Sequence, residues 1–388
     1  MKIAFIGQKG IPAKSGGVEK HVEEIATRLA QKGHEVFVYV RNNYTPKNLN
    51  GYRGIKLVHL PSIPTKHLDA ISHTFFATIH ALFQNYNVIH YQAIGPSSLS
   101  PIIKVFKRKT ALIATYHCQD YFHQKWNWFA RTCLRFGGAI ASLVPDKTIT
   151  VSKILENHIQ NKFKKQAVVI PSGMDVFPTS ESQYLAKWNL QKNSYVLSVS
   201  RLIRHKGVHY LIEAFKNLED QHLTRGKKLV IIGDGFHTDD YVKEIKDLSR
   251  GRENIIFTGS QFGEALNQFF SHAYCFVQPS ESEGLSIALL EAMGYGKAIL
   301  SSDIKENMQA LNDDMSVSFH SGDVYDLEEK LVFLINNPAL VKTMGEKAMI
   351  KAQTEFSWDK IVDQTEAVYE DVLFKKRRVL SRQYGKNI

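Results

Sequence analysis

KIAFIGQKGIPAKSGGVEKHVEEIATRLAQKGHEVFVYV, residues 2–40, is the stretch that decides the fold of this chain. Its two ends, residues 2–7 and 35–40, are short runs of mainly apolar and β-branched residues, which are typical of buried strands. The amphipathic segment between them, residues 18–33, ends in a glycine, as helices often do. A strand, a helix and a second strand in this order predict a βαβ unit and a parallel sheet.

The same alternation continues along the chain and then begins again. Further strands in the first half are predicted at residues 55–60, 88–93, 111–117, 148–152 and 167–171. A segment near residues 172–192 has the Pro, Gly and Ser composition of a linker. Strands in the second half are predicted at residues 195–200, 228–235, 254–260, 274–280, 297–303 and 316–321. We therefore expect an α/β protein with two doubly wound parallel-sheet domains, residues 1–175 and 176–356, that face a central ligand cleft.

Length and composition favour a two-domain globular protein of the cytoplasm. The 388 residues exceed the size at which a single core keeps growing, and 44% hydrophobic with 22% charged residues is ordinary for globular proteins. Three widely spaced cysteines argue against a disulfide framework or a zinc site. The apolar run at residues 2–7 is too short for a signal peptide, and no stretch reaches the ~18 apolar residues of a membrane span.

The net charge of +11 is unevenly distributed. Residues 1–175 contain 23 Lys and Arg against 9 Asp and Glu, whereas residues 176–388 contain 26 against 29. The basic half predicts an anionic partner, which is a membrane surface, a nucleic acid or a phosphate-bearing substrate. KVFKRK (104–109) and HQKWNWFARTCLRF (123–136) combine cations with aromatic residues, as interfacial segments do. We expect the protein to dock peripherally on the inner face of the cell membrane.

The most informative motif is PSESEGLSIALLEAMGYGKAIL, residues 279–300. Glu283 lies between a predicted strand end and Gly284, and Glu291 follows eight positions later on a predicted helix. A carboxylate in such a loop can accept hydrogen bonds from sugar hydroxyls, and a second one suits the vicinal diol of a ribose. The alternative is a pair of surface glutamates on an ordinary helix.

Three further segments follow predicted strands. In SRLIRHKG (200–207), Arg201 and Lys206 flank a turn and could neutralise a diphosphate, although a solvated basic loop is the alternative. Gly16 and Gly17 precede a helix and expose bare amides to a phosphate or sugar, although glycine there is also simple turn chemistry. In TYHCQD (115–120), His117 and more weakly Asp120 could contact a sugar, although a lone histidine is more often structural.

Across essentially its whole length the sequence resembles glycosyltransferase family 4, which are retaining enzymes of the GT-B fold with two Rossmann-like domains. Glu283 and Glu291 match the family's E-x7-E pair, and Arg201 and Lys206 match its R-x4-K pair. IPSGMD (170–175) resembles its domain junction, and residues 356–373 resemble its closing helix. We expect this helix, over about residues 357–388, to cross back to the N-terminal domain. The opening segment is similar to a bacterial surface-polysaccharide subgroup that includes rhamnosyltransferase-like proteins.

The resemblance implies a role for each matching residue. Arg201 and Lys206 would bind the diphosphate of a UDP-, GDP- or dTDP-sugar, Glu291 its ribose, and Glu283 the hydroxyls of the transferred sugar. His117 would also contact that sugar. The remaining donor-site positions implied are Gly16, Gly17, Gly284, Leu285 and Ser286. The N-terminal domain would bind a glycan or lipid-linked acceptor, and the C-terminal domain would bind the donor.

The resemblance also implies a mechanism without metal or other cofactor. No D-x-D or carboxylate cluster indicates a metal, and Arg and Lys can neutralise the diphosphate instead. The departing phosphate would accept the proton of the acceptor hydroxyl, so that no enzyme nucleophile is needed. Two positions depart from the family pattern: Ser286, where many members have glycine, and Ser15, where the subgroup often has tyrosine.

Three alternatives remain at this point. A sugar-nucleotide epimerase of the same fold would need no acceptor, but the two charge pairs disfavour it. A dinucleotide-dependent dehydrogenase is disfavoured because the Gly-x-Gly-x-x-Gly fingerprint is missing. A basic nucleic-acid-binding protein is disfavoured because no helix-turn-helix, zinc or RNP-like pattern occurs. We therefore expect no nucleic-acid partner.

Overall fold

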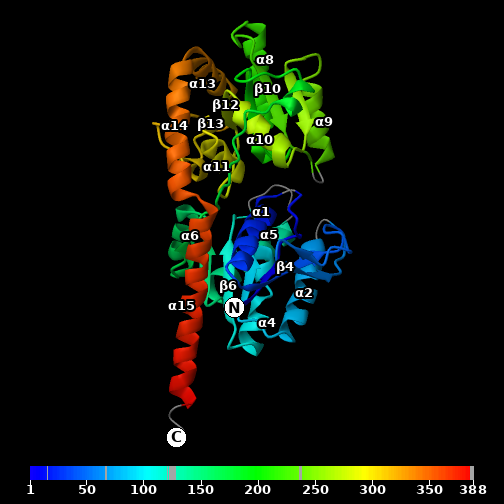
Figure 1. Ribbon diagram of the computed structural model, residues 1–388, viewed down its shortest axis with the longest axis vertical. Coiled ribbons are helices and arrows are strands. Elements are labelled where there is room, and N and C mark those ends of the chain that lie inside the picture. Colours follow the sequence, from blue (N-terminus) through cyan, green and yellow to red (C-terminus); the bar gives the residue numbers. More distant parts are fainter. Residues whose placement is uncertain (15, 66–67, 120, 122–127, 236–237, 385–388) are drawn as a thin grey trace. The chain divides into compact units, whose positions relative to one another are not determined.

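The computed structural model describes residues 1–14, 16–65, 68–119, 121, 128–235 and 238–384. The chain divides into two compact units (Figure 1). Unit 1 consists of Met1–Ser172 and Trp358–Ile388, and unit 2 consists of Gly173–Ser357. The boundary predicted after residue 175 lies close to Ser172.

Unit 1 is built on an eight-stranded sheet in the order β3-β4-β2-β1-β5-β6-β7-β8. All neighbouring strands are parallel except the short hairpin of β3 and β4. The strand order reverses between β1 and β5, and at such a switch point the connections leave room for a ligand. The strands are β1 (Lys2–Ile6), β2 (Glu35–Arg41), β3 (Gly51–Tyr52), β4 (Ile55–Leu60), β5 (Val88–Gln92), β6 (Ala111–Tyr116), β7 (Lys147–Thr150) and β8 (Val168–Val169).

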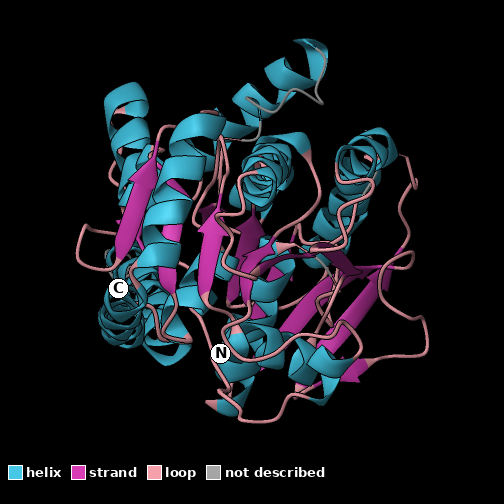
Figure 2. Ribbon diagram, turned by 90° about the horizontal axis from the view of Figure 1, so that it is seen from above, coloured by secondary structure: helices cyan, strands magenta, loops and turns pink. Residues whose placement is uncertain are grey.

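Helices cover both faces of the sheets, whose central strands are almost completely buried (Figure 2). In unit 1 the central strands β1, β5 and β6 are almost fully buried. The helices of unit 1 are α1 (Gly17–Gln31), α2 (Asp69–Leu82), α3 (Ile94–Ser97), α4 (Ser100–Phe106), α5 (Trp128–Leu143), α6 (Lys153–Phe163) and α15 (Trp358–Tyr384).

The last helix, α15, packs against α1, although the two are far apart in the sequence. Arg28 on α1 forms an ion pair with Asp359 on α15 at 3.0 Å. Deeper in the unit, the Tyr369 hydroxyl lies 2.6 Å from Nδ1 of His90 on β5, and Trp358 is almost completely buried. The closing helix implied by the family resemblance is therefore part of unit 1.

Unit 2 contains a six-stranded, all-parallel sheet in the order β11-β10-β9-β12-β13-β14. Here the strand order reverses between β9 and β12. The strands are β9 (Tyr195–Val199), β10 (Lys228–Ile232), β11 (Ile255–Gly259), β12 (Cys275–Gln278), β13 (Ala298–Ser302) and β14 (Ser316–Phe319). The helices are α7 (Gln183–Ala186), α8 (Val208–Asp220), α9 (Asp239–Leu248), α10 (Gly263–His272), α11 (Ile287–Gly294), α12 (Lys305–Met308), α13 (Val324–Asn336) and α14 (Pro338–Glu355).

Every strand predicted from the sequence is present, but several end earlier than predicted. The run predicted over residues 228–235 ends at Ile232, because Gly233 has a φ of 144° and leaves the extended conformation. The segment predicted as a linker is packed against the rest of unit 2. The Met174 amide donates to the Phe356 carbonyl at 2.8 Å, and Met174 is buried.

Among the described residues, no helix is both long enough and apolar enough to cross a membrane.

Candidate active site

The loops that follow β9 and β12 meet at the switch point of the unit 2 sheet. A short 3₁₀ turn, Arg204–Lys206, ends at Gly207, whose φ of 68° favours glycine. A side chain at Gly207 would collide with the Pro279 carbonyl oxygen, because its Cβ would lie only 1.9 Å away. The Glu281 amide also donates to the His205 carbonyl at 2.9 Å. The two predicted donor-binding loops are therefore tied together by backbone contacts.

Lys206 and Glu283 form a bidentate ion pair where these loops meet. The Lys206 ammonium lies 2.6 Å from each carboxylate oxygen of Glu283. Their side chains are only 13% and 6% exposed, so the pair is well shielded from water. Two neutral groups also donate to Oε1 of Glu283: the Gln278 amide at 2.6 Å and the Ser280 hydroxyl at 2.7 Å. The orientation of this carboxylate is thus fixed from several directions.

Helix α11 begins directly after this carboxylate. The Ser286 hydroxyl caps the helix by accepting a hydrogen bond from the Leu289 amide at 3.3 Å. Gly284 and Leu285 form the short connection from Glu283 to this cap. Glu291 lies on α11 and is partly exposed. Burial, followed by the charge of Glu291 among other contributions, raises the pKa of Tyr295 to about 12.

Arg201 lies in the loop after β9, on the same edge of the sheet as Lys206. Its side chain is exposed and makes no hydrogen bond or ion pair with the described part of the chain. The neighbouring backbone is fixed, because the Leu202 amide donates to the Asp234 carbonyl at 3.0 Å. An available guanidinium on an anchored loop suits a phosphate ligand, since its fork can bind two oxygens.

In unit 1 the equivalent edge of the sheet contains the loop between β1 and α1. A Cβ on Gly7 would lie 2.5 Å from the Gln92 carbonyl oxygen, so this loop starts close to the end of β5. Gly16 precedes α1 with a φ of 98°, and Gly17 is the first helical residue. The buried Glu19 carboxylate accepts from the Lys9 amide at 3.1 Å and thereby holds the loop against the helix.

His117 lies just past β6 at this same edge, and its ring is mostly buried. Its Nε2 is 2.8 Å from Oε1 of Gln92, and its ring packs edge-on against His21 with centroids 4.8 Å apart. His21, on α1, is bonded through Nδ1 to the Ser172 hydroxyl at 3.2 Å. Only 7% of His117 is exposed, so most of its surface already contacts protein.

Burial keeps these imidazoles neutral. It lowers the pKa of His117 to about 4. It also lowers the pKa of His90 to about 3, with a smaller contribution from the charge of His117. For His21, burial and then the charges of His117 and His90 lower the pKa well below its ordinary value. Near neutral pH each ring therefore stays uncharged and acts only as a hydrogen-bonding group.

Among the predicted residues, the structure brings Lys206 and Glu283 into direct contact. Unit 2 contains Arg201, Lys206, Gly284, Leu285, Ser286, Glu283 and Glu291, and unit 1 contains Gly16, Gly17 and His117. Asp120 and Ser15 lie outside the described residues. The sequence analysis missed His21, Gln92, Gln278 and Ser280. A glutamine ending a buried strand, as in CFVQ and VIHYQ, was a usable signal for both glutamines.

Two family models match consecutive parts of the chain. The model described as Glycosyltransferase Family 4 matches residues 15–176, and the model described as Glycosyl transferases group 1 matches residues 180–351. An uncharacterised glycosyltransferase of Methanocaldococcus jannaschii is 25% identical and covers 92% of this chain and 95% of its own length. The O-antigen chain mannosyltransferase C of Escherichia coli is 23% identical, with 97% of this chain and all of the relative covered.

Solved structures support the same fold. Sucrose-phosphate synthase of Thermosynechococcus elongatus has a TM-score of 0.81 at 20% identity, covering 96% of this chain and 99% of its own. HepE of Anabaena in complex with UDP-glucose has a TM-score of 0.78 at 20% identity, covering 96% of this chain and 100% of its own. Both parallel-sheet units therefore match the GT-B architecture predicted from the sequence.

The buried histidines predict that unit 1 loses stability in mild acid. Their folded pKa values lie below the unfolded value of about 6.5, so stability is complete above that pH and declines as the pH falls toward about 4. We expect the urea concentration at the midpoint of the unfolding transition of unit 1 to decrease when the pH is lowered from neutral to about 5. In the variant His90→Gln this decline should be smaller, because one titrating ring is gone. An equal decline in the wild type and in His90→Gln would contradict the assignment of the acid sensitivity to the buried histidines.

Proposed function

Because the chain belongs to the glycosyltransferases, with a Family 4 region followed by a group 1 region, we propose that it is a retaining, metal-independent hexosyl- or deoxyhexosyltransferase. It would transfer the sugar of a nucleotide-diphosphate donor to an acceptor hydroxyl. The observation that carries this proposal is the Lys206–Glu283 pair beside the exposed Arg201 at the switch point of unit 2. A diphosphate needs the two cations, and a sugar needs the carboxylate.

In the proposed reaction, the bond between the anomeric carbon and the diphosphate oxygen breaks. The acceptor oxygen bonds to the same carbon on the face that the diphosphate leaves, and its proton passes to the departing phosphate. Arg201 and Lys206 stabilise the charge that develops on the leaving group. Glu283 holds the hydroxyls of the sugar, and Glu291 holds the ribose. The chain's own groups therefore position the reactants and stabilise charge, and none needs to act as a nucleophile.

For the nucleotide base of the donor and for the acceptor, we propose classes of compound rather than single compounds. A HepE structure contains UDP-glucose, which makes UDP-sugars the first donors to test, followed by GDP- and dTDP-sugars. Similarity to an O-antigen mannosyltransferase supports an acceptor in cell-surface polysaccharide or glycolipid synthesis. An epimerase would convert the sugar nucleotide without any acceptor, so acceptor-dependent release of the nucleoside diphosphate distinguishes the two activities.

Substitutions of the ion pair test the donor site. Lys206→Ala should weaken donor binding and lower turnover, because the loss of a charge-assisted contact costs about 1.5–3 kcal/mol. Glu283→Gln should lower kcat more than it raises KM, because the carboxylate acts on the sugar being transferred. Steady-state kinetics with the donor that binds the wild-type protein measures both effects.

The matched control is Lys243→Ala, which removes an exposed lysine from α9 in the same unit. Its kinetics should equal those of the wild type. If folded Lys206→Ala and Glu283→Gln proteins also behave like the wild type, the donor-site assignment is wrong.

Metal independence and retention can be tested in one assay. Activity should survive exhaustive EDTA treatment, because Arg201 and Lys206 supply the cationic charge. NMR of the product should show the same anomeric configuration as the donor sugar. Activity that returns only with Mg²⁺ or Mn²⁺, or an inverted product, would contradict the respective part of the proposal.

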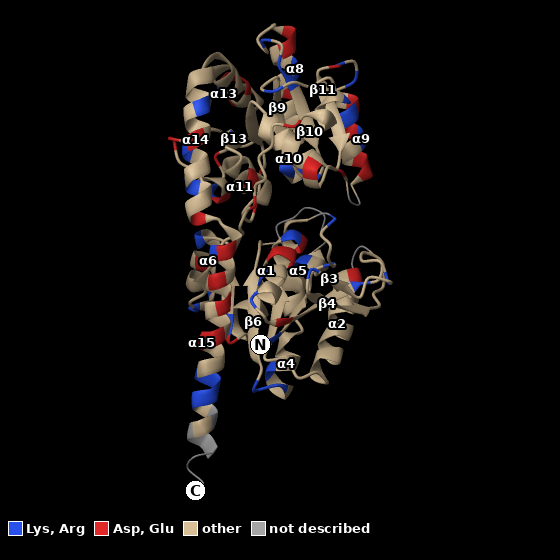
Figure 3. Ribbon diagram, viewed as in Figure 1, with Lys and Arg blue, Asp and Glu red and all other residues tan. Residues whose placement is uncertain are grey.

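We also propose that unit 1 docks on an acidic membrane from the cytoplasmic side and there reaches a lipid-linked acceptor. Residues 1–172 and 358–388 contain 30 Lys and Arg against 13 Asp and Glu, a net charge of +17, whereas unit 2 has a net charge of −6. The positive charge is therefore a property of unit 1. Lys and Arg residues of this unit lie on the lower part of α15 and beside α4 (Figure 3). A surface of this sign attracts acidic headgroups.

Two basic segments, far apart in the sequence, lie side by side on unit 1. The Lys376 ammonium on α15 donates to the Arg108 carbonyl at 2.9 Å, just beyond α4. Lys104 does not contribute free charge, because it is paired with Asp146. Lys375 is likewise paired, with Asp371 at 2.6 Å. The resulting basic rim consists of Lys107, Arg108, Lys109, Arg377 and Arg378.

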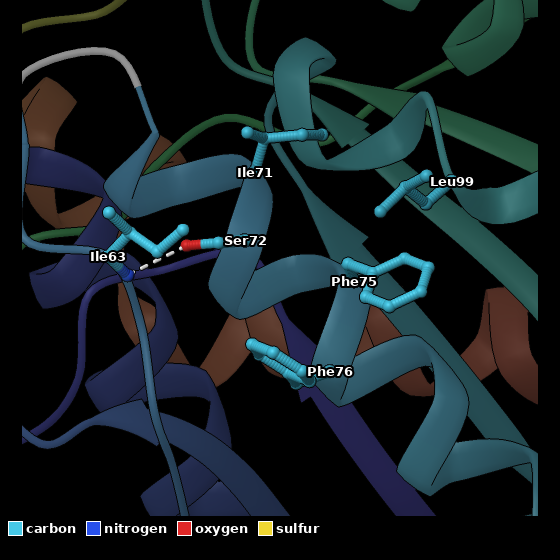
Figure 4. A pocket seen from close by; sticks show the side chains of 6 residues that line it. All are labelled: Ile63, Ile71, Ser72, Phe75, Phe76 and Leu99. Atoms are coloured by element: carbon cyan, nitrogen blue, oxygen red, sulfur yellow. Dashed lines mark hydrogen bonds between the residues drawn. The ribbon is translucent and has the colours of Figure 1, made fainter.

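Large apolar side chains are exposed on α2, α4 and α5 of the same unit. α4 contacts both α2 and α5, so these three helices are neighbours. On α2, a shallow apolar pocket is lined by Ile63, Ile71, Ser72, Phe75, Phe76 and Leu99 (Figure 4). Phe106 on α4 and Trp128 on α5 are 72% and 78% exposed. The aromatics of the described part of residues 123–136 are thus exposed rather than core, and Lys125 and Trp126 lie outside the described residues.

Cosedimentation with liposomes tests the docking. Each basic residue near an acidic surface adds about 1 kcal/mol, so binding should rise with acidic lipid and fall at high salt. Replacing Arg108, Lys109, Arg377 and Arg378 by serine should weaken binding strongly. A matched variant with serine at Lys192, Lys243, Lys246 and Lys342 of unit 2 should bind like the wild type. No binding to acidic liposomes at low salt would contradict the proposal and favour a soluble acceptor.

A further inference from the structure

Gln278, the last residue of β12, contacts several groups of the candidate donor site. Only 2% of the residue is exposed. The Nε2 group donates to the Ser280 hydroxyl at 2.7 Å and to Oε1 of Glu283 at 2.6 Å. The Oε1 atom accepts from the Ser286 hydroxyl at 3.3 Å. The amide therefore connects the carboxylate of Glu283 to the residue that caps α11.

This connection matters because the ion pair and the donor compete for the same cation. In the structure, both oxygens of Glu283 are bonded to the Lys206 ammonium. A diphosphate attracts that ammonium as well, and Lys206 then has to divide its three N–H donors between the phosphate and the carboxylate. Glu283 loses part of its cationic partner at the moment when it has to hold the sugar.

The neutral donors are not affected by this competition. Gln278 and Ser280 both donate to Oε1 of Glu283, and neither carries a charge that a phosphate would attract. They can keep Oε1 in place while Oε2, which is bonded only to Lys206 among the described residues, becomes available to sugar hydroxyls. Buried networks of this kind fix the geometry of a functional group when all members are satisfied.

We propose that Gln278 is a positioning residue that holds the Glu283 carboxylate toward the transferred sugar when the donor diphosphate engages Lys206. This inference rests on the proposed glycosyltransferase function. The contact with Ser286 extends the positioning role to α11, the helix that bears Glu291. Through this contact the Gln278 amide fixes the Glu283 carboxylate relative to the first turn of α11. This link depends on the Ser286 side chain, so it cannot form in those members of the family that have glycine at this position.

The decisive variant is Gln278→Met, which keeps the length of the side chain and removes its hydrogen bonds. Binding of UDP, GDP and dTDP, measured by calorimetry, should change less than about twofold, because the diphosphate contacts remain. With whichever of UDP-glucose, GDP-mannose or dTDP-rhamnose the wild type uses, kcat should fall by roughly 10–100-fold, the effect of losing a hydrogen bond to a charged group. A purely structural defect would instead lower thermal stability and nucleotide binding together.

Gln268→Met is the matched control. Gln268 is a fully buried glutamine on α10 of the same unit, and its recorded hydrogen bonds are to Tyr184 and Glu264 rather than to the donor site. We expect it to lose stability without losing kcat. If Gln278→Met retains wild-type kcat, the inference is wrong. If the wild type neither binds nor turns over any of the three sugar nucleotides, it is the proposed function that fails.

Gln278→Glu provides a second, pH-dependent measurement. The introduced carboxylate repels Glu283 at neutral pH, but two adjacent carboxyl groups tend to share a proton, and the introduced group can donate as the amide does once it is protonated. Relative to the wild type, the activity of this variant should rise as the pH falls from about 8 to about 6. A ratio that does not change with pH would contradict the positioning role.

Discussion

The close approach of two backbone segments at Gly207 is the constraint on which the candidate site of unit 2 depends. With no side chain there, the turn after β9 can lie against the Pro279 carbonyl at the start of the loop after β12. This contact brings Lys206, from one loop, to Glu283, from the other. The reversal of strand order between β9 and β12 places both loops at the same edge of the sheet. Backbone sterics and sheet topology together therefore create an ion pair between residues that are 77 positions apart in the sequence.

The sequence was sufficient to predict the repeated β–α pattern, because strands buried on both faces leave a strong apolar signal. It was also sufficient to place Arg201, Lys206, Glu283 and Glu291 in loops or helices directly after strands. It could not reveal which of these side chains touch. The Lys206–Glu283 pair depends on the separation of two loops, and that separation depends on Gly207, whose role is not evident from its neighbours in the chain.

Groups that support other groups were harder to find than groups expected to meet a ligand. Gln92 and Gln278 each end a buried strand and bond to a predicted site residue, His117 and Glu283. Their importance arises from contacts made across the fold, which a linear pattern does not contain. Lys104 shows the opposite case. The sequence analysis counted it among the cations available to a membrane, but in the structure it is paired with Asp146. The charge that a surface presents can be derived from the sequence only after residues in such ion pairs have been left out.

The assignment of α15 to unit 1 has a consequence for how the protein is made. Unit 2 is one continuous segment, Gly173–Ser357, whereas unit 1 consists of the first part of the chain and the last. During synthesis from the N-terminus, every residue of unit 2 emerges from the ribosome before unit 1 is complete. The partner of His90 in the core of unit 1, Tyr369, is translated only after the whole of unit 2. The core of unit 1 is thus completed only after unit 2 has been synthesised, and α1 stays uncovered by α15 until then.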